Sequence, residues 1–332
     1  MNIVVVGCGD WGKNIARTLK NLESLHAICD QLTYSQNGLE KAVQTAAELN
    51  VPIKDFEEVL EDPTVDGVVI STPPASHYAL AKKALLAGKH VFVEKPLVPS
   101  LKQALDLETT AKEVHKTLMV GHLLRYHSAF ETLTLWATEK KLGEILHINT
   151  SRKNLGKIYP NDSVIWDFAP HDLSMILSLM EKPVKSVLAT SGNYAIPLHA
   201  DEAMISLKFE GSQHSAFITL SRLSPFKEQK ITVVGTKGMA VFDDTLAWDG
   251  KLRYFDNQIT QRSPSEFDIH RDAEGKAEPL SPSEPLKNEM MHFMECIRHQ
   301  KGPRTPAKDA ITILAIIQAA HQSIQENRWV DL

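Results

Sequence analysis

Two opposite charges close an apolar run in the stretch HVFVEKPL, residues 90–97. Its first half is typical of a buried strand, whereas Glu94 and Lys95 are charged and Pro96 follows them. In an open parallel sheet, ligands bind just beyond the carboxyl ends of the strands. Pro96 lacks an N–H group and restricts the residue before it to extended conformations, which would fix the direction of the lysine. The stretch therefore predicts that Lys95 projects into a ligand cleft.

A glycine-rich loop follows the first apolar run, in the stretch VVVGCGDWG at residues 4–12. Gly7, Gly9 and Gly12 have the spacing G-x-G-x-x-G, between an expected strand and an expected helix. The first glycine allows a tight turn, the second lets the backbone approach a pyrophosphate, and the third allows close packing of helix on strand. The helix N-terminus then offers free N–H groups to the phosphates. The sequence predicts a dinucleotide site; a glycine-rich turn without a ligand is the alternative.

Asp30 ends the second expected strand, about 20 residues beyond the loop, where a carboxylate would bind the adenosine ribose hydroxyls. Gln31 and Leu32 follow it instead of an arginine, so a 2′-phosphate has no evident partner and NAD is favoured over NADP. A solvated strand end is the alternative for Asp30. Asp10 would repel a phosphate if it pointed inward, so we expect it to face solvent.

Further candidate cofactor contacts lie in the loop and at the ends of the next two strands. The complete candidate set for the cofactor is Gly7, Gly9, Asp10, Trp11, Gly12, Asp30, Ser71, Thr72, Pro73, His77, Glu94 and Lys95.

The composition is that of an ordinary globular protein of more than one domain. The chain has 332 residues, of which 43% are hydrophobic and 23% charged, and single cores stop growing near about 250–300 residues. A net charge of −5 would repel nucleic acids and anionic membranes at long range. We therefore expect a small-molecule ligand and neither a nucleic-acid nor a membrane partner.

Cysteine usage indicates a reduced, cytoplasmic setting. Cys8, Cys29 and Cys296 are too few and too scattered for a disulfide framework, and no metal-ligand spacing is present, so no metal is expected. The apolar start has no basic segment before it and no cleavage site after it. No stretch reaches the roughly 20 apolar residues that span a bilayer.

The first 121 residues alternate strand and helix patterns, which predicts βαβ units and a doubly wound parallel sheet of the Rossmann type, that is, an NAD-binding domain over 1–121. Continuous apolar runs are expected of strands that are buried on both faces. The expected strands are 3–6, 25–30, 67–72 and 89–95, and the expected helices are 12–21, 39–49 and 74–88.

From residue 122 onward the pattern is that of an α+β domain with a mostly antiparallel sheet, so the whole chain is of the α/β class with domains 1–121 and 122–332. The region 263–285 is rich in Pro, Ser and acidic residues and reads as a surface loop. Helical spacing of apolar residues predicts a final helix over 307–326. The expected strands are 143–152, 202–210, 214–222 and 228–242.

Three segments resemble a known family, the glucose–fructose oxidoreductase, inositol dehydrogenase and MocA family of NAD(P)-dependent sugar dehydrogenases. They are GCGDWGKNIAR at 7–17, STPPASHYALAKKALLAGKHVFVEKPL at 71–97 and DFAPHDL at 167–173. The resemblance implies a Rossmann domain followed by an α/β domain with a large open sheet, whose open face makes a dimer or tetramer contact. It also implies that the final helix packs back near the first domain and that the Lys95–Pro96 bond is cis. The same resemblance implies that His77 could approach the cofactor; a local cap is the alternative.

The family's catalytic pattern is a lysine in Glu-Lys-Pro and a later Asp-x-x-x-His, which fall here on Lys95, Asp167 and His171. Oxidising a secondary alcohol needs a base for the hydroxyl proton and a positive charge beside the developing alkoxide. His171 is the expected base and Lys95 the cation, although the reverse assignment stays open. Asp167 precedes His171 by one helical turn and could orient its imidazole. A histidine that only stabilises the fold is the alternative for His171.

Within the family, WGKNIAR, GHLLRYH and SRKNLG resemble the branch acting on UDP-activated amino sugars, the UDP-N-acetylglucosamine 3-dehydrogenase-like branch. Close relatives there often have serine where Asp167 stands and proline where Ser128 stands. This resemblance implies oxidation at C3 of a UDP-N-acetylhexosamine. A simple-sugar or inositol dehydrogenase is one alternative, and a non-catalytic NAD sensor or scaffold is another.

Candidate substrate contacts follow two strands, where loops usually carry binding groups. Arginine can bind a diphosphate bidentately, so a UDP-linked substrate would use such residues. For the arginines the alternative is a surface ion pair. The candidates are Arg125, Tyr126, Arg152, Asn154 and His171.

Overall fold

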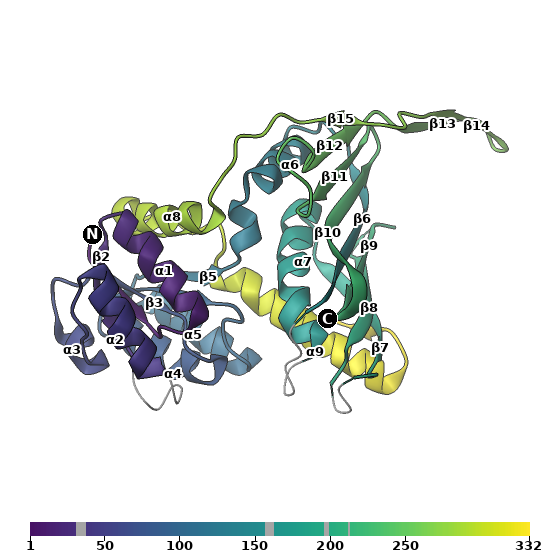
Figure 1. Cartoon of the computed structure of the whole chain (residues 1–332). Coiled ribbons are helices and arrows are strands. Elements are labelled where there is room, and N and C mark those ends of the chain that lie inside the picture. Colours follow the sequence, from purple (N-terminus) through teal and green to yellow (C-terminus); the bar gives the residue numbers. More distant parts are fainter. Residues whose placement is uncertain (31–37, 157–162, 196–198, 212) are drawn as a thin grey trace. The chain divides into compact units, whose positions relative to one another are not determined.

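The computed structural model describes residues 1–30, 38–156, 163–195, 199–211 and 213–332 (Figure 1). The expectation drawn from Gln31 and Leu32 falls outside these described residues. Contacts divide the chain into two compact units. The first comprises Met1–Tyr126 and Glu284–Leu314, and the second His127–Ser283 and Ala315–Leu332.

This division differs from one placed after residue 121. The 3-10 helix η1 (Leu123–Tyr126) belongs to the first unit because it packs on α8 (Pro285–His299). The hydroxyl of Tyr126 also lies 3.1 Å from that of Thr305. The final helix, α9 (Ala307–Glu326), has the bounds that the sequence predicts, and it contributes residues up to Leu314 to the first unit and the rest to the second.

The first unit contains a five-stranded sheet of order β2-β1-β3-β4-β5, in which every pair is parallel. The doubly wound Rossmann architecture is therefore confirmed. Fully buried apolar side chains fill β1, β3 and β5, as strands covered on both faces require. The strands are β1 (Ile3–Val6), β2 (Leu25–Cys29), β3 (Gly67–Ile70), β4 (His90–Glu94) and β5 (Leu118–Gly121); the helices are α1 (Asp10–Asn21), α2 (Gly38–Leu49), α3 (Phe56–Glu61), α4 (Pro74–Leu86) and α5 (Leu101–Glu113).

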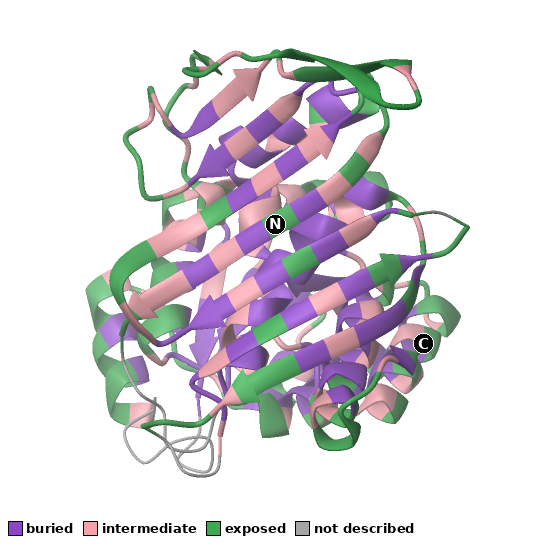
Figure 2. Cartoon of the chain, turned by 90° about the vertical axis from the view of Figure 1, so that its right-hand side faces the viewer, coloured by how far each residue is buried: buried purple, intermediate pink, exposed green. Residues whose placement is uncertain are grey.

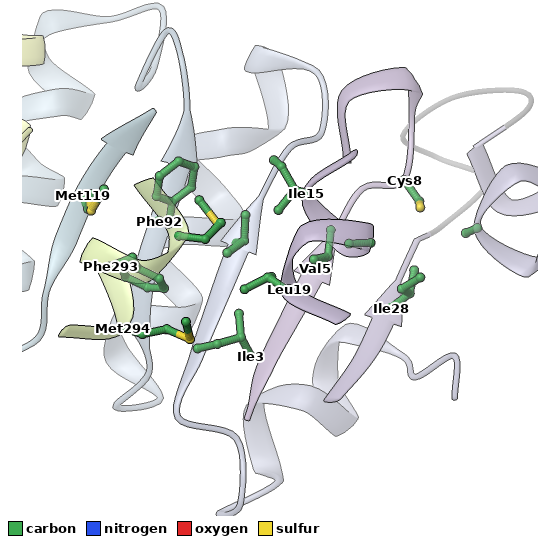
Figure 3. Close-up of a cluster of buried hydrophobic side chains, with 14 of the residues drawn as sticks. Ile3, Val5, Cys8, Ile15, Leu19, Ile28, Phe92, Met119, Phe293 and Met294 are labelled. Carbon is green, nitrogen blue, oxygen red and sulfur yellow. The ribbon is translucent and has the colours of Figure 1, made fainter. Parts of the chain in front are cut away.

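The core of this unit includes a helix from late in the sequence. Helix α8 packs beside α1 and places Phe293 and Met294 against the sheet and α1 (Figure 3). The rings of Phe92 and Phe293 meet edge to face with centroids 5.9 Å apart. An edge-to-face aromatic pair stabilises the fold by about 0.5–1.5 kcal/mol beyond the contribution of the area that it buries. Helix α8 is therefore an integral part of the first unit.

The second unit is built on a nine-stranded sheet of order β15-β12-β11-β10-β6-β9-β8-β7-β16, in which only β6 and β9 pair in parallel. The mostly antiparallel α/β domain is thus confirmed. Helix α7 (Val164–Met180) packs on β6, β8 and β9, and α6 (Ser128–Thr138) packs on α7 and β11. The strands are β6 (Ile145–Leu155), β7 (Val184–Gly192), β8 (Glu202–Phe209), β9 (Ser215–Ser221), β10 (Leu223–Gly235), β11 (Met239–Asp243), β12 (Leu252–Phe255), β15 (Lys276–Ala277) and β16 (Val330–Asp331).

Along the strands of this sheet exposed and buried residues alternate, as they do where helices cover only one face (Figure 2). Met204 and Phe217 lie on the opposite face, on neighbouring strands β8 and β9, and are 57% and 45% exposed. Buried neighbours such as Ile205 and Ile218 point to the helix-covered side. The unit therefore presents an open, partly apolar sheet face.

Two expectations for this unit are wrong. The single strand at 228–242 is two strands, β10 and β11, because the chain turns where Gly235 N–H donates to the Gly238 carbonyl. The region 263–285 is not only a loop, since β14 (Glu266–His270) pairs with β13 (Gln258–Ser263) as a hairpin. Its polar composition concealed an alternating apolar face, which Ile259 shares with its partner Ile269.

Candidate active site

The glycine loop has the geometry that a dinucleotide needs. Gly7 has a positive φ of 90°, and a Cβ there would lie 2.7 Å from the backbone nitrogen of Thr72. A Cβ on Gly12 would lie 2.1 Å from the Gly7 carbonyl oxygen. A Cβ on Gly9 would meet nothing within 4 Å, and no side chain caps α1 at this residue. The backbone at Gly9 and the first N–H groups of α1 are thus accessible to an anion, so the residues present fit a pyrophosphate.

The two carboxylates near the loop have different surroundings. Asp30 is buried, and its Oδ2 accepts a hydrogen bond from the Cys8 N–H at 2.8 Å, which ties the loop to the end of β2. Asp10 faces solvent, as expected, and pairs with Lys41 at 2.9 Å. Asp30 is therefore part of the frame that holds the loop, whereas the charge of Asp10 is directed away from it.

Hydrogen bonds connect the residues after β3 to one another, to the glycine loop and to the end of β4. The Ser71 hydroxyl donates to the Gly7 carbonyl at 2.9 Å, and the Thr72 hydroxyl lies 2.6 Å from that of Ser76. His77 is buried, with Nε2 2.7 Å from the Thr72 carbonyl and Nδ1 2.9 Å from the Pro96 carbonyl. Burial lowers the pKa of His77, partly offset by these hydrogen bonds. His77 thus connects the ends of β3 and β4, while Pro73 precedes α4 as its N-cap residue.

Glu94 and Lys95 lie at the carboxyl end of β4, and the Lys95–Pro96 bond is cis, as the resemblance implies. The Trp11 indole N–H donates to Glu94 Oε1 at 2.5 Å, and the Lys95 backbone N–H donates to Oε2 at 3.1 Å. Burial raises the pKa of Glu94 to about 7, although the bond from Trp11 and the charge of Lys95 act in the opposite direction. The Glu94 carboxyl therefore titrates near neutral pH beside the candidate catalytic lysine.

Asp167 and His171 lie one turn apart on α7, whose N-cap, Ser163, accepts a bond from the Trp166 N–H. The sequence predicts that Asp167 orients His171. The structure adds a contact that the sequence did not suggest, in which Arg222 Nη2 donates to Asp167 Oδ2 at 2.9 Å. Arg222 is 1% exposed and lies at the end of β9, far from Asp167 in the chain. A buried cation thus holds the candidate acid in place.

Two of the candidate substrate residues, Arg152 and Arg125, form ion pairs with carboxylates. Arg152 forms a buried, two-bond pair with Asp172, of 2.8 Å from Nε and 3.3 Å from Nη2. Burial raises the pKa of Asp172 and the charge of Arg152 opposes that rise. Arg125 pairs with Asp309 at 3.4 Å within the first unit. Asp172 is thus the partner of a candidate substrate residue.

Tyr126 and Asn154 are two further candidates, and the Arg304 guanidinium lies 4.8 Å from the centre of the Tyr126 ring. Tyr126 is buried, with its hydroxyl beside Thr305. Asn154 is half-buried, and its Oδ1 has no hydrogen-bond partner among the described residues. In the described part of the chain no group of three or more His, Cys, Asp or Glu residues could hold a metal, and no helix is long and apolar enough to cross a bilayer.

Residues 1–122 match the GFO_IDH_MocA model, "Oxidoreductase family, NAD-binding Rossmann fold", and residues 138–332 match "Oxidoreductase family, C-terminal alpha/beta domain". The chain belongs to this family. It is an oxidoreductase, and its cofactor is NAD, which its first domain binds.

Two relatives and one solved structure illustrate the similarity of this family member. The scyllo-inositol 2-dehydrogenase (NAD(+)) of Bacillus subtilis is 28% identical over 305 residues, 88% of this chain and 85% of the relative. The UDP-N-acetylglucosamine 3-dehydrogenase of Acidithiobacillus ferrooxidans is 30% identical over 183 residues, 54% of each chain. A crystal form of an enzyme of that name and organism has a TM-score of 0.83 and 22% identity, covering 98% of both chains.

Proposed function

We propose that this oxidoreductase removes hydride from a ring carbon of a sugar, that the substrate is a UDP-N-acetylhexosamine, and that the C3 hydroxyl becomes a ketone. The observation that carries the chemistry is the pairing of buried Arg222 with Asp167, one helical turn from His171, in a chain that also has Lys95 at the end of β4. The nucleotide-sugar substrate is supported by the motifs around Arg125 and Arg152 and by the similarity over 183 residues to UDP-N-acetylglucosamine 3-dehydrogenase.

In the proposed reaction two side chains act on one hydroxyl. His171 accepts the hydroxyl proton, and the Lys95 ammonium stabilises the developing alkoxide. NAD, held at the loop of Gly7, Gly9 and Gly12, would supply the hydride acceptor. Arg222 holds Asp167 by a charge-assisted hydrogen bond, so that the acid keeps one position on α7 relative to His171. Such fixed charges are effective because they need little rearrangement during the reaction.

One structural observation favours a second candidate, an inositol or simple-sugar dehydrogenase. The two arginines that could bind a diphosphate each face a carboxylate, Arg152 with Asp172 and Arg125 with Asp309. A neutral polyol would not need an unneutralised cation. The similarity to scyllo-inositol 2-dehydrogenase over 88% of the chain agrees with this candidate.

A substrate panel separates the candidates. Purified protein and NAD are incubated with UDP-sugars and with free polyols, and reduced nicotinamide is followed, with a coupled reaction that consumes the ketone. Turnover with a UDP-N-acetylhexosamine and a 3-keto product supports the proposal, whereas turnover with inositol and no UDP-sugar refutes the substrate. NAD binding without turnover on any member of the panel would favour a sensor or scaffold.

The proposal also concerns how copies of the chain associate and in which compartment the protein works. We propose that two or four copies associate through the open sheet face that bears Met204 and Phe217. We also propose a reducing cytoplasmic setting, since the three cysteines are free and buried.

A further inference from the structure

Glu289 is a buried acid for which the proposed reaction has no use. It lies on α8, it is 0% exposed, and neither carboxyl oxygen has a hydrogen-bond partner among the described residues. The residues around it on this helix, such as Met290 and Phe293, are apolar core. An ionised carboxylate in such a place would lose its hydration without any donor to replace it, which is far more costly than burying a neutral acid.

Glu94 is the acid whose charge acts on Glu289, and unlike Glu289 it accepts hydrogen bonds. Two N–H groups donate to its carboxyl, and the charge of Lys95 is beside it. Its Oε2 lies so close to the backbone of β5 that a Cβ on Gly121 would come within 2.9 Å. Burial first, and the charge of Glu94 second, raise the pKa of Glu289 well above its usual range. A negative charge on the pair is therefore most stable on Glu94.

Other ionisable groups near the pair do not supply a cation to Glu289. The charge of Glu289 contributes to the raised pKa of Tyr126 in η1. The Arg304 guanidinium lies 4.8 Å from the centre of the Tyr126 ring. Arg125 of η1 pairs with Asp309. His122, after β5, has a pKa lowered to about 3 by burial and by the charges of Arg125 and Lys95, so it is neutral. None of these cations appears among the groups that act on Glu289.

We propose that Glu289 is a positioning residue that works as a neutral carboxylic acid: its hydroxyl is a hydrogen-bond donor towards Glu94, and Glu94 carries the single negative charge of the pair. A proton on Glu289 gives Glu94 a donor instead of a second negative charge. The benefit for NAD rests on the proposed role of the β4 end, because the nicotinamide ring of NAD⁺ is positive and an ionised Glu94 would attract it. The protonation of Glu289 does not depend on that role.

The first test counts protons in the absence of cofactor and substrate. An acid whose pKa is raised by folding stabilises the protein fully below its unfolded pKa, and that stabilisation is lost as pH rises through the folded pKa. At pH values between the unfolded and the folded pKa of Glu289, the folded protein should thus hold one more proton, on Glu289, than the unfolded chain. The free energy of unfolding is measured from pH 6 to 9 for the unsubstituted protein and for E289Q. We expect its slope against pH to differ by one proton between the two proteins over the range in which Glu289 is protonated in the folded state only.

The control for this measurement is E295Q, which replaces an exposed glutamate on the same helix and should leave the slope unchanged. An unchanged slope in E289Q would show that Glu289 is ionised in the folded protein, which overturns the proposal.

The second test asks whether the donor matters for NAD⁺. The dissociation constant is measured against pH for E289Q, which keeps a neutral donor, and for E289L, which keeps only the apolar bulk. The affinity for NAD⁺ should rise as Glu94 becomes negatively charged near about pH 7. We expect E289Q to keep the midpoint and affinity within about twofold, and E289L to shift the midpoint upward and weaken binding several-fold. Equal losses in both variants would show that the anion is needed and would overturn the proposal.

Neither test contains a sugar. If the substrate panel fails, both measurements still give an answer on Glu289, and if Glu289 fails them, the proposed oxidation is unaffected.

Discussion

Gly9 is the residue at which ligand binding and folding can be separated most cleanly. Its backbone is extended, with φ −65° and ψ −167°, and a Cβ would meet open space. G9V should therefore fold normally but fill the space needed by a pyrophosphate, so we expect NAD to bind at least about tenfold more weakly, or about 1.4 kcal/mol. Calorimetric titration and thermal unfolding measure the two effects.

The matched control is G302V, because Gly302 also has nothing within 4 Å of an added Cβ. It should change neither affinity nor melting temperature. Unaltered NAD binding in G9V would place the pyrophosphate elsewhere.

Lys95 is the residue on which the proposed chemistry depends most directly. It follows β4 at the end of the sheet where ligands bind, next to the Glu94 carboxyl. K95A should lower kcat by about 100- to 1,000-fold, the usual loss when a charge that stabilises an oxyanion is removed. Steady-state kinetics and NAD titration together test this.

NAD affinity should largely persist in K95A, since the glycine loop is untouched, and K95R should recover part of kcat because it keeps the charge. Normal turnover of K95A would refute the mechanism.

At the scale of elements, the Arg152–Asp172 pair joins β6 to α7, the helix that carries Asp167 and His171. Both members are buried, so R152M would leave an uncompensated carboxylate in the interior. We expect R152M to lower the free energy of unfolding by about 3–5 kcal/mol, measured by denaturant titration.

The double variant R152M/D172L provides the comparison, because replacing both partners by apolar groups removes the unpaired charge. It should be markedly more stable than R152M. If the two variants are equally stable, the pair is not what holds α7 to the sheet.

Sequence patterns correctly located those elements whose buried residues recur at a regular spacing. The strand at 3–6 and the helix at 307–326 were predicted with their final bounds, since β1 is buried on both faces and α9 keeps one apolar face. The β13–β14 hairpin was missed because Pro, Ser and acidic residues dominate its neighbourhood. The loop and Lys95 carry local motifs, whereas Arg222 lies 55 residues from Asp167 and has no spacing signal. Contacts between distant segments leave no trace in local periodicity.

At the scale of the whole molecule, the last quarter of the chain completes the first unit. Residues 284–314 return to it, and they include Glu289 of α8 and Thr305, which meets Tyr126. Helix α8 also fills the core beside Phe92. A fragment that ends near residue 121 would therefore lack part of its hydrophobic core, which is why a domain boundary placed where the βαβ pattern stops is incomplete.

At the scale of the whole molecule, the open sheet face is also the proposed contact between copies of the chain. Phe217 stands on β9 at the middle of this face, between β6 and β8, and such exposed apolar patches commonly mark contacts between chains. F217E would place a charge in the contact, and charges are depleted from the cores of such interfaces. We expect the proposed dimer or tetramer to dissociate at least about tenfold more readily, measured by sedimentation velocity over a dilution series. F267E is the control, because Phe267 is 55% exposed but lies on the hairpin strand β14 and not on the nine-stranded sheet. A native mass in F217E, or a monomer without any substitution, would show that this face makes no contact between copies.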